Sequence, residues 1–305
     1  LDKLGIEPDE YHAFEIDPYP TAVSMYNFPN IIRHGDARNW TKLKGKKIDL
    51  LVAGFPCQSY SVAGLQKFQD DPRDMSKVLL DALRGLAIDK VLIENVASMP
   101  SEWRDYFTQT FKEIFPDIWC YELNSANDSA QNRKRLYWTN IKFTRSKDKG
   151  IVLQDILEDG GMVDRDKSYC VDANYFKGGS MKMYYEKARR QLVFDTNNYR
   201  YVDRKWYYKG CHQVGEADLK GYDIIKRVYS TSGKAPALTT MQGGWRQPKI
   251  ATDELHWRNL TPLECERLQT VPEGYTTHVS NTQRYRMLGN GWTVDVVSHI
   301  FKYIQ

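Results

Sequence analysis

The stretch Leu50-Leu-Val-Ala-Gly-Phe-Pro-Cys-Gln-Ser-Tyr-Ser61 carries both a fold signal and a chemical signal. Its apolar start predicts a buried β-strand that ends at Gly54. Pro56 then fixes its own φ angle directly before Cys57. Open α/β sheets bind their ligands at the carboxyl ends of strands, so a cysteine at this place is a candidate nucleophile. The alternative is a small buried apolar side chain, which is the commoner role of a lone cysteine.

Short apolar stretches alternate with helical spacing on both sides of this strand. We expect strands at residues 11–16, 49–53, 90–93 and 135–141, and helices at residues 18–26 and 75–86. Such an alternation predicts a doubly wound α/β sheet of the Rossmann-like type. Helical spacing returns at residues 262–268, and residues 289–305 are expected to end in an apolar helix.

The pattern changes near residue 159. Paired glycines at 160–161, 178–179 and 243–244 interrupt a stretch that is rich in Tyr, Trp, Lys and Arg. Residues 160–250 hold 17 Lys and Arg against 9 Asp and Glu, whereas the rest of the chain holds 26 against 30. We therefore expect a catalytic domain of residues 1–160, completed by residues 280–305, and a smaller, mostly β domain of residues 161–279. The basic segment suits a polyanionic partner, although a solvated basic surface would give the same count.

Composition excludes several classes of protein. No apolar run approaches the ~18 residues of a membrane span, and no signal peptide is visible. The five cysteines form no C-x-x-C pair and the six histidines no H-x-x-x-H pair. We therefore expect neither a disulfide framework nor a metal centre.

Two further segments place polar groups at strand ends. Glu94 and Asn95 follow an apolar strand, where a poorly solvated carboxylate can have a raised pKa and share a proton near neutrality. The alternatives for Glu94 are a helix N-cap or a buried ion pair. Arg133 and Arg135 lie two apart in an extended segment, so both point to one face and can hold a phosphate or a base carbonyl. A solvated edge strand would look the same.

At this point the residues carry a family resemblance. The segments that resemble the ordered motifs of DNA cytosine-5 methyltransferases are Pro56-Cys-Gln58, Glu94-Asn-Val96, Gln131-x-Arg-x-Arg135, Arg258-x-Leu-Thr-Pro-x-Glu264-x-x-Arg267-Leu-Gln and Leu288-Gly-Asn-Gly-Trp292. Each segment alone is weak, but five in the correct order are specific. They cover nearly all of the chain except the basic middle region, which is the most variable part of that family.

The resemblance implies a reaction and a role for each residue. It implies methyl transfer from S-adenosylmethionine to C5 of a cytosine flipped out of double-stranded DNA. Cys57 would add to C6 of the base, Glu94 would hold the N3/N4 edge, Arg135 would hold O2, and Arg133 would support the site or a nearby phosphate. The implied cofactor residues are Glu15 at the ribose, Ile16 and Asp36 at the adenine, and Pro56, Asn290 and Trp292 around the methionine end. The implied DNA contacts are Gln58, Ser61 and Arg73 in a mobile loop, with Thr239 and Thr240 in the second domain, which would be the target-recognition domain.

The resemblance also implies a localisation, an oligomeric state and partners for the enzyme. We expect a cytoplasmic protein of a bacterium or a phage-infected cell that acts as a monomer on DNA, without a metal or a membrane. The sequence leaves open whether a cognate restriction endonuclease accompanies it. The target sequence is not readable either, because no arginine can be singled out for base contacts.

One departure from the family pattern concerns the cofactor. The family opens with a strand and a glycine-containing turn that cradles the methionine part of the cofactor, and this sequence has neither. Residues 1–5 resemble the end of the helix that follows that turn. Because the absent strand is central to such a sheet, we expect roughly 15–20 further residues upstream in the natural protein.

Three other functions compete with this interpretation. A tRNA cytosine-5 methyltransferase would share the catalytic residues, but the basic second domain favours duplex DNA. A catalytically silent DNA-binding homologue is supported by the absent cofactor turn and opposed by the intact catalytic residues. A cysteine-dependent hydrolase would need a histidine base, and no histidine occurs between His34 and His212.

Overall fold

A computed structural model describes residues 1–56, 75–158, 161, 163–179, 181–194 and 257–304 of the chain, together with the strands at 199–202, 205–208, 213–216, 227–230 and 249–251. The first half contains β1 (His12–Ala13), α1 (Pro18–Asn27), β2 (Ile32–Arg33), β3 (Lys47–Gly54), α2 (Ser76–Gly85), β4 (Ala87–Val96), α3 (Ser101–Ile114), β5 (Trp119–Asn124) and β6 (Lys134–Thr139). Short 3-10 helices in this half are η1 (Asp2–Leu4), η2 (Ala37–Leu43) and η5 (Ser125–Asn127).

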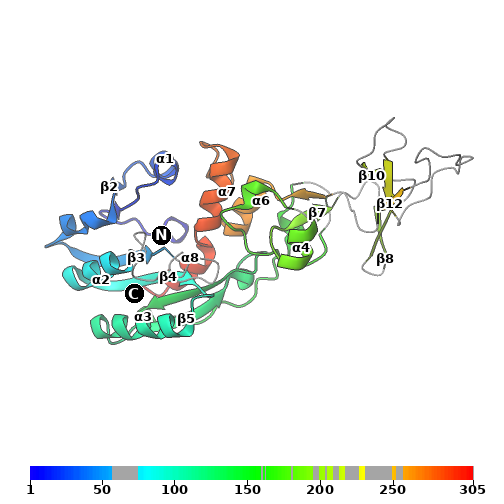
Figure 1. Cartoon of the computed structure of the whole chain (residues 1–305). Helices are drawn as coiled ribbons and strands as arrows, with labels where there is room; N and C mark the ends of the chain where they lie inside the picture. Colours follow the sequence, from blue (N-terminus) through cyan, green and yellow to red (C-terminus); the bar gives the residue numbers. More distant parts are fainter. Residues whose placement is uncertain are drawn as a thin grey trace, which may run out of the picture.

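The second half is built from shorter elements. They are η6 (Leu153–Ile156), η7 (Tyr175–Lys177), α4 (Met181–Lys187), β7 (Leu192–Phe194), β8 (Tyr199–Val202), β9 (Lys205–Tyr208), β10 (Gln213–Glu216), β11 (Arg227–Ser230), β12 (Lys249–Ala251) and β13 (Trp257–Asn259). Three helices follow: α6 (Pro262–Gln269), α7 (Asn281–Asn290) and α8 (Val294–Phe301). Figure 1 shows β8, β10 and β12 far from the main sheet, with α4 and β7 between them and the body.

The main sheet is mixed. Its order is β3-β4-β6-β5, with β3 parallel to β4 and β6 antiparallel to both of its neighbours. The four expected strands are all present, and β3, β4 and β6 lie within a few residues of their expected bounds. The strand expected at residues 11–16 is only the two-residue β1, because its ladder with β2 joins just His12 to Ile32 and Ala13 to Arg33. In the described residues β1 and β2 form a separate two-stranded parallel sheet.

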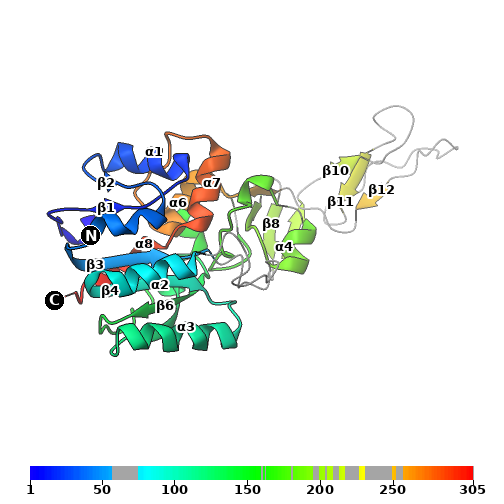
Figure 2. The ribbon, with the colours of Figure 1, turned by 60° about the vertical axis from the view of Figure 1, so that its left-hand side comes forward.

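Both faces of the main sheet are covered by helices, as a doubly wound sheet requires (Figure 2). Val91 and Ile93 of β4 point to the face that holds Phe107 and Phe111 of α3, together with α2. Leu92 points to the opposite face, against Val296 and Ile300 of α8. The uninterrupted apolar run of β4 is therefore explained, because each of its side chains is buried on one face or the other. Burying each such side chain contributes on the order of 1.5–3 kcal/mol.

A further apolar cluster joins the body to the second half of the chain. Cys265 and Leu268 of α6 pack with Ala130, Leu153 and Leu288, although α6 lies within residues 161–279. Helix α6 begins at a capping box, in which Thr261 accepts from the backbone of Glu264 and the Glu264 carboxylate accepts from the backbone of Thr261.

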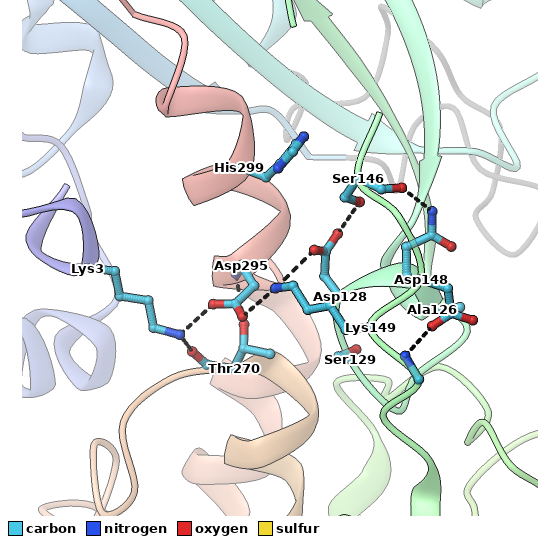
Figure 3. Close-up of polar contacts among 12 residues, drawn as sticks. Lys3, Ala126, Asp128, Ser129, Ser146, Asp148, Lys149, Thr270, Asp295 and His299 are labelled. Carbon is cyan, nitrogen blue, oxygen red and sulfur yellow. Dashed lines mark hydrogen bonds and ion pairs between the residues drawn. The ribbon is translucent and has the colours of Figure 1, made fainter. Parts of the chain in front are cut away.

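Figure 3 shows a polar cluster that ties together segments lying far apart in the sequence. The ammonium group of Lys3 lies 2.5 Å from Oδ1 of Asp295 and donates to the carbonyl of Thr270. Lys149 lies 3.1 Å from both Asp128 and Asp295. These contacts fix the start of α8 against η1 and the segment after η5.

Two features are absent from the described ranges. No helix there has the length and apolar composition to cross a membrane. No group of three or more His, Cys, Asp or Glu side chains in the same ranges is arranged to hold a metal ion.

Candidate active site

The site is built around Glu94, near the carboxyl end of β4. Its side chain is only 13% exposed, and its Oε1 forms an ion pair with Nε of Arg135 at 2.9 Å. The other oxygen, Oε2, accepts a hydrogen bond of 3.3 Å from Nε1 of Trp292. Of the two alternatives to a catalytic role, the helix N-cap is absent and the buried ion pair is present. The ion pair does not decide the matter, because a catalytic carboxyl also needs to be held in place.

The surroundings make Glu94 easier to protonate than a solvated glutamate. Burial raises its pKa above the ordinary value, although the charges of Arg135 and Arg133 and the hydrogen bond from Trp292 act in the opposite direction. Desolvation dominates because the charged form has lost most of its water. Such a carboxyl is suited to sharing a proton with a bound base.

The two arginines have different tasks. Arg135 lies next to Glu94 and donates through Nη1 to the carbonyl of Lys134 at 2.8 Å. Arg133 is 3% exposed, and its two Nη groups donate to three carbonyls, those of Val171 (2.9 Å), Gly289 (2.9 Å) and Gly291 (2.7 Å). Because both Nη groups already donate to carbonyls, few N–H donors of this guanidinium remain for a phosphate. Of the two roles left open for Arg133, its contacts therefore favour support of the site.

The turn that carries Trp292 is held by side chains from distant segments. Besides Arg133, Gln269 at the end of α6 donates to the carbonyl of Leu288 at 2.5 Å and accepts from the hydroxyl of Thr293 at 2.9 Å. Gly289 lies so close to the backbone of Asp172 that a Cβ there would approach it to 2.3 Å, so no other residue fits without a shift. Sequence reasoning missed Gln269, whose only signal was its place in the Arg-Leu-Gln end of the fourth motif.

Strand β3 leads directly to the proposed nucleophile. Gly54 is paired with Glu94 in the parallel ladder, and the next residue, Phe55, is buried. The carbonyl of Phe55 accepts a hydrogen bond from the side chain of Asn95 at 3.3 Å. The described chain continues to Pro56. Cys57 itself lies outside the described residues, as do Gln58, Ser61, Arg73, Thr239 and Thr240.

The expected cofactor residues are divided between two places. Glu15 and Ile16 follow β1, and Asp36 follows β2 after two further residues. Because these strands run parallel, both carboxylates lie at the same edge of that small sheet. Ile16 is 75% exposed, Glu15 accepts from the backbone of Asp17, and Asp36 caps η2. Asn290 is exposed at the end of α7. An exposed apolar side chain at a sheet edge that also carries two carboxylates fits the adenosine part of S-adenosylmethionine, which offers hydroxyl and amino donors beside a flat ring.

An open hollow of about 470 Å³ lies beside Arg135, the ion-pair partner of Glu94. It is lined by Val96, Ala97, Ser98, Glu122, Lys134 and Arg135.

Comparison with known proteins decides the family. The model of the family described as C-5 cytosine-specific DNA methylase matches residues 4–305. The chain belongs to this family. The family predicted from the sequence is thereby confirmed.

Several bacterial and phage methyltransferases are similar to nearly the whole chain. It is 26% identical over 420 residues to the orphan methyltransferase M.SPBetaI of Bacillus phage SPbeta, a match that covers 99% of this chain and 93% of that protein. It is 26% identical over 310 residues to the type II methyltransferase M.HhaI of Haemophilus parahaemolyticus, with 95% and 85% covered.

Solved structures support the fold. A DNMT2 variant of Spodoptera frugiperda has a TM-score of 0.61 at 20% identity, covering 99% of this chain and 94% of that chain. The methyltransferase EhMeth of Entamoeba histolytica has a TM-score of 0.58 at 15% identity, with 95% and 88% covered. At such identities the likeness concerns the fold alone. Together with the mixed sheet it confirms the predicted α/β fold of the S-adenosylmethionine-dependent methyltransferase type.

Within this methylase, residues from three of the predicted motifs meet. Glu94, Arg133, Arg135 and Trp292 are joined by direct contacts or through the turn at residues 289–291, whereas Glu15, Ile16 and Asp36 follow the strands of the smaller sheet. The structure therefore assembles the expected acid and both guanidiniums in one place.

Proposed function

We propose that the protein transfers a methyl group from S-adenosylmethionine to C5 of a cytosine flipped out of double-stranded DNA, through a covalent adduct with Cys57. The observation that carries the proposal is the pairing of Gly54 with Glu94. It brings the strand that runs into Cys57 beside a buried carboxyl whose pKa is raised.

The chemistry needs both groups because C5 of cytosine is a poor nucleophile. The thiolate of Cys57 adds to C6 and forms an S–C6 bond, while Glu94 gives its proton to N3 and takes up the charge that develops there. Electron density then rises at C5, which accepts the methyl group. Loss of the C5 proton to water, departure of the thiolate and return of the N3 proton to Glu94 restore the aromatic ring. S-Adenosylmethionine supplies an electrophilic methyl group on a sulfonium.

The remaining residues would hold the reactants. Arg135 has Nε on Glu94 and Nη1 on Lys134, so its Nη2 is the group available for O2 of the base. Glu15 would accept from the ribose hydroxyls, Ile16 would pack on the adenine, and Asp36 would accept from its amino group. Pro56, Asn290 and Trp292 would lie around the methionine end.

The second half of the chain would recognise the target sequence, and the segment after Cys57 would add further DNA contacts. We assign residues 1–160 with 280–305 to catalysis and residues 161–279 to target recognition, with one protein molecule on each site. The antiparallel hairpin β8–β9 concentrates Tyr, Trp, Arg and Lys, residue types that stack on bases and bind phosphates. Gln58, Ser61, Arg73, Thr239 and Thr240 remain proposed contacts. Flipping the base costs a few kcal/mol, which these contacts would offset.

The deciding experiment traps the adduct. A duplex containing 5-fluorocytosine keeps the base attached to the enzyme, because fluorine at C5 cannot leave as a proton does. The expected result is a cofactor-dependent adduct that peptide mapping assigns to Cys57. The control is Cys120→Ser, since burial raises the pKa of the Cys120 thiol to about 11 and the adduct should persist without it.

Two results would overturn the proposal. One is DNA binding without any adduct, and the other is an adduct on a different cysteine. A parallel assay of methyl transfer to tRNA separates the two substrate classes, and turnover on tRNA alone would exclude duplex DNA as the substrate.

A further inference from the structure

Trp292 touches the catalytic centre directly, on the side opposite Arg135. Its indole N–H donates to Oε2 of Glu94, whereas Arg135 is paired with Oε1. A methyl group built on Gly54 would lie 3.4 Å from Oε2 of Glu94 and 3.5 Å from Nε1 of Trp292. The end of β3 therefore forms a floor beneath both side chains, and the carboxyl is fixed at both oxygens.

The indole is itself well anchored. The carbonyl of Gly291, the residue before Trp292, accepts from Arg133 at 2.7 Å and lies 3.5 Å from Nε2 of Gln269. Thr293, the residue after Trp292, is 1% exposed and donates to Gln269. Because the backbone on both sides of Trp292 is tied down, the position of its ring is set by the body of the protein.

The charged and titratable groups around Glu94 come from β6 and from the residue just before it. They are Arg135 and Tyr137 of β6 and Arg133, and Tyr137 is the residue paired with Glu94 in the antiparallel ladder. Burial raises the pKa of Tyr137 above its ordinary value, so that phenol stays neutral. Trp292 carries no charge, and its hydrogen bond is the contribution of the turn.

We propose that Trp292 is a positioning residue for Glu94. The indole N–H of Trp292 fixes the orientation of the Glu94 carboxyl that faces the substrate base. The proposal rests on the proposed function, because it gives Trp292 a task in the same site. It adds to the expected place of Trp292 at the methionine end of the cofactor pocket.

An indole can only donate a hydrogen bond, so it always favours the charged, accepting form of the carboxyl. Removing the donor while keeping an aromatic ring should raise the pKa of Glu94 further and leave the carboxyl free to rotate. A loss of orientation reduces the rate of the bound complex more than the binding of substrate.

The test compares Trp292→Phe with Trp119→Phe. Trp119 is 57% exposed on the edge strand β5, so the control makes the same change away from Glu94. In Trp292→Phe we expect kcat to fall by roughly 5- to 10-fold with KM for duplex DNA nearly unchanged. The alkaline limb of the kcat/KM profile should shift to higher pH by roughly half to one unit. This limb is assigned to Glu94 if the Glu94→Gln variant lacks it. Calorimetric affinity for S-adenosylmethionine should stay within about twofold, because the ring remains.

A second measurement does not depend on turnover. Infrared difference spectra against Glu94→Gln report the protonated carboxyl of Glu94, and its band should persist to higher pH in Trp292→Phe than in the parent. A band that titrates unchanged would overturn the positioning role, whether or not the enzyme is active. So would a uniform loss of activity at every pH with a lowered Tm, which is the signature of structural damage. Failure of the proposed function has a different signature, namely no methylation by the parent enzyme despite a normal band shift in the variant.

Discussion

Gly54 of β3 and Glu94 of β4 are direct partners in a parallel ladder. The register matters because side chains alternate between the two faces of a strand, so a slip of one residue would turn the carboxyl to the other side of the sheet. The floor of the site is thus set by strand pairing, and the chain reaches Cys57 only three residues after Gly54.

Replacing Cys57 by serine should abolish turnover and leave DNA binding largely intact. A hydroxyl is too weakly acidic to supply the nucleophile, whereas it has nearly the size of the thiol. Methyl incorporation from labelled S-adenosylmethionine measures the first effect and a gel shift on duplex DNA the second. Normal turnover by the serine variant would exclude the covalent mechanism.

Replacing Glu94 by glutamine should reduce kcat by roughly 10²-fold or more, the usual contribution of a positioned acid or base. The amide keeps the size and one acceptor for Trp292 or Arg135, but it has no proton to give. Single-turnover kinetics on duplex DNA isolates this step from product release. The matched control Glu113→Gln changes an exposed carboxylate on α3 and should stay near the parent rate, and an equal loss in both variants would contradict a special role for Glu94.

The raised pKa of Glu94 also predicts how stability depends on pH. The folded protein binds the proton of Glu94 more tightly than the unfolded chain does, whose glutamate titrates near 4.5. The stabilisation is therefore complete below pH 4.5 and is lost as the pH rises through the raised pKa. Glutamine has no such proton, so the free energy of unfolding of Glu94→Gln, relative to the parent, should increase between about pH 5 and pH 8. Urea unfolding at both pH values measures this difference, and a constant difference would contradict the raised pKa.

Local sequence patterns predicted where the strands end, but not which distant side chains come together at those ends. The apolar runs before Gly54 and Glu94 predicted β3 and β4, because a strand buried on both faces is apolar along its whole length. The helix α3 and the edge strand β5 were not anticipated. Nothing local connects Trp292 to Glu94, which lie 198 positions apart, because that contact depends on how α7 and α8 pack on the body. The same holds for Gln269, whose buried amide donates a hydrogen bond to the carbonyl of Leu288.

The two arginines should separate stability from catalysis. Arg133→Met removes the donors of three carbonyls, those of Val171, Gly289 and Gly291, in a site that is almost inaccessible to water. Buried acceptors left without partners cost about 1–3 kcal/mol each, so the free energy of unfolding should fall by roughly 3 kcal/mol or more. Arg135→Met leaves Glu94 without its cation, but that carboxyl can take up a proton and escape most of the penalty.

We therefore expect Arg135→Met to lose only about 1 kcal/mol of stability, while its kcat falls by roughly 10²-fold because the base loses its O2 donor and Glu94 its partner. Urea unfolding and single-turnover methylation of both variants make the comparison. Arg133→Lys serves as the control for charge, since one ammonium group lacks the forked geometry needed to reach both Val171 and Gly291 and should restore only part of the stability. If Arg133→Met kept its stability and lost only activity, the guanidinium would be bound to substrate or DNA, and the support role assigned to it here would be wrong.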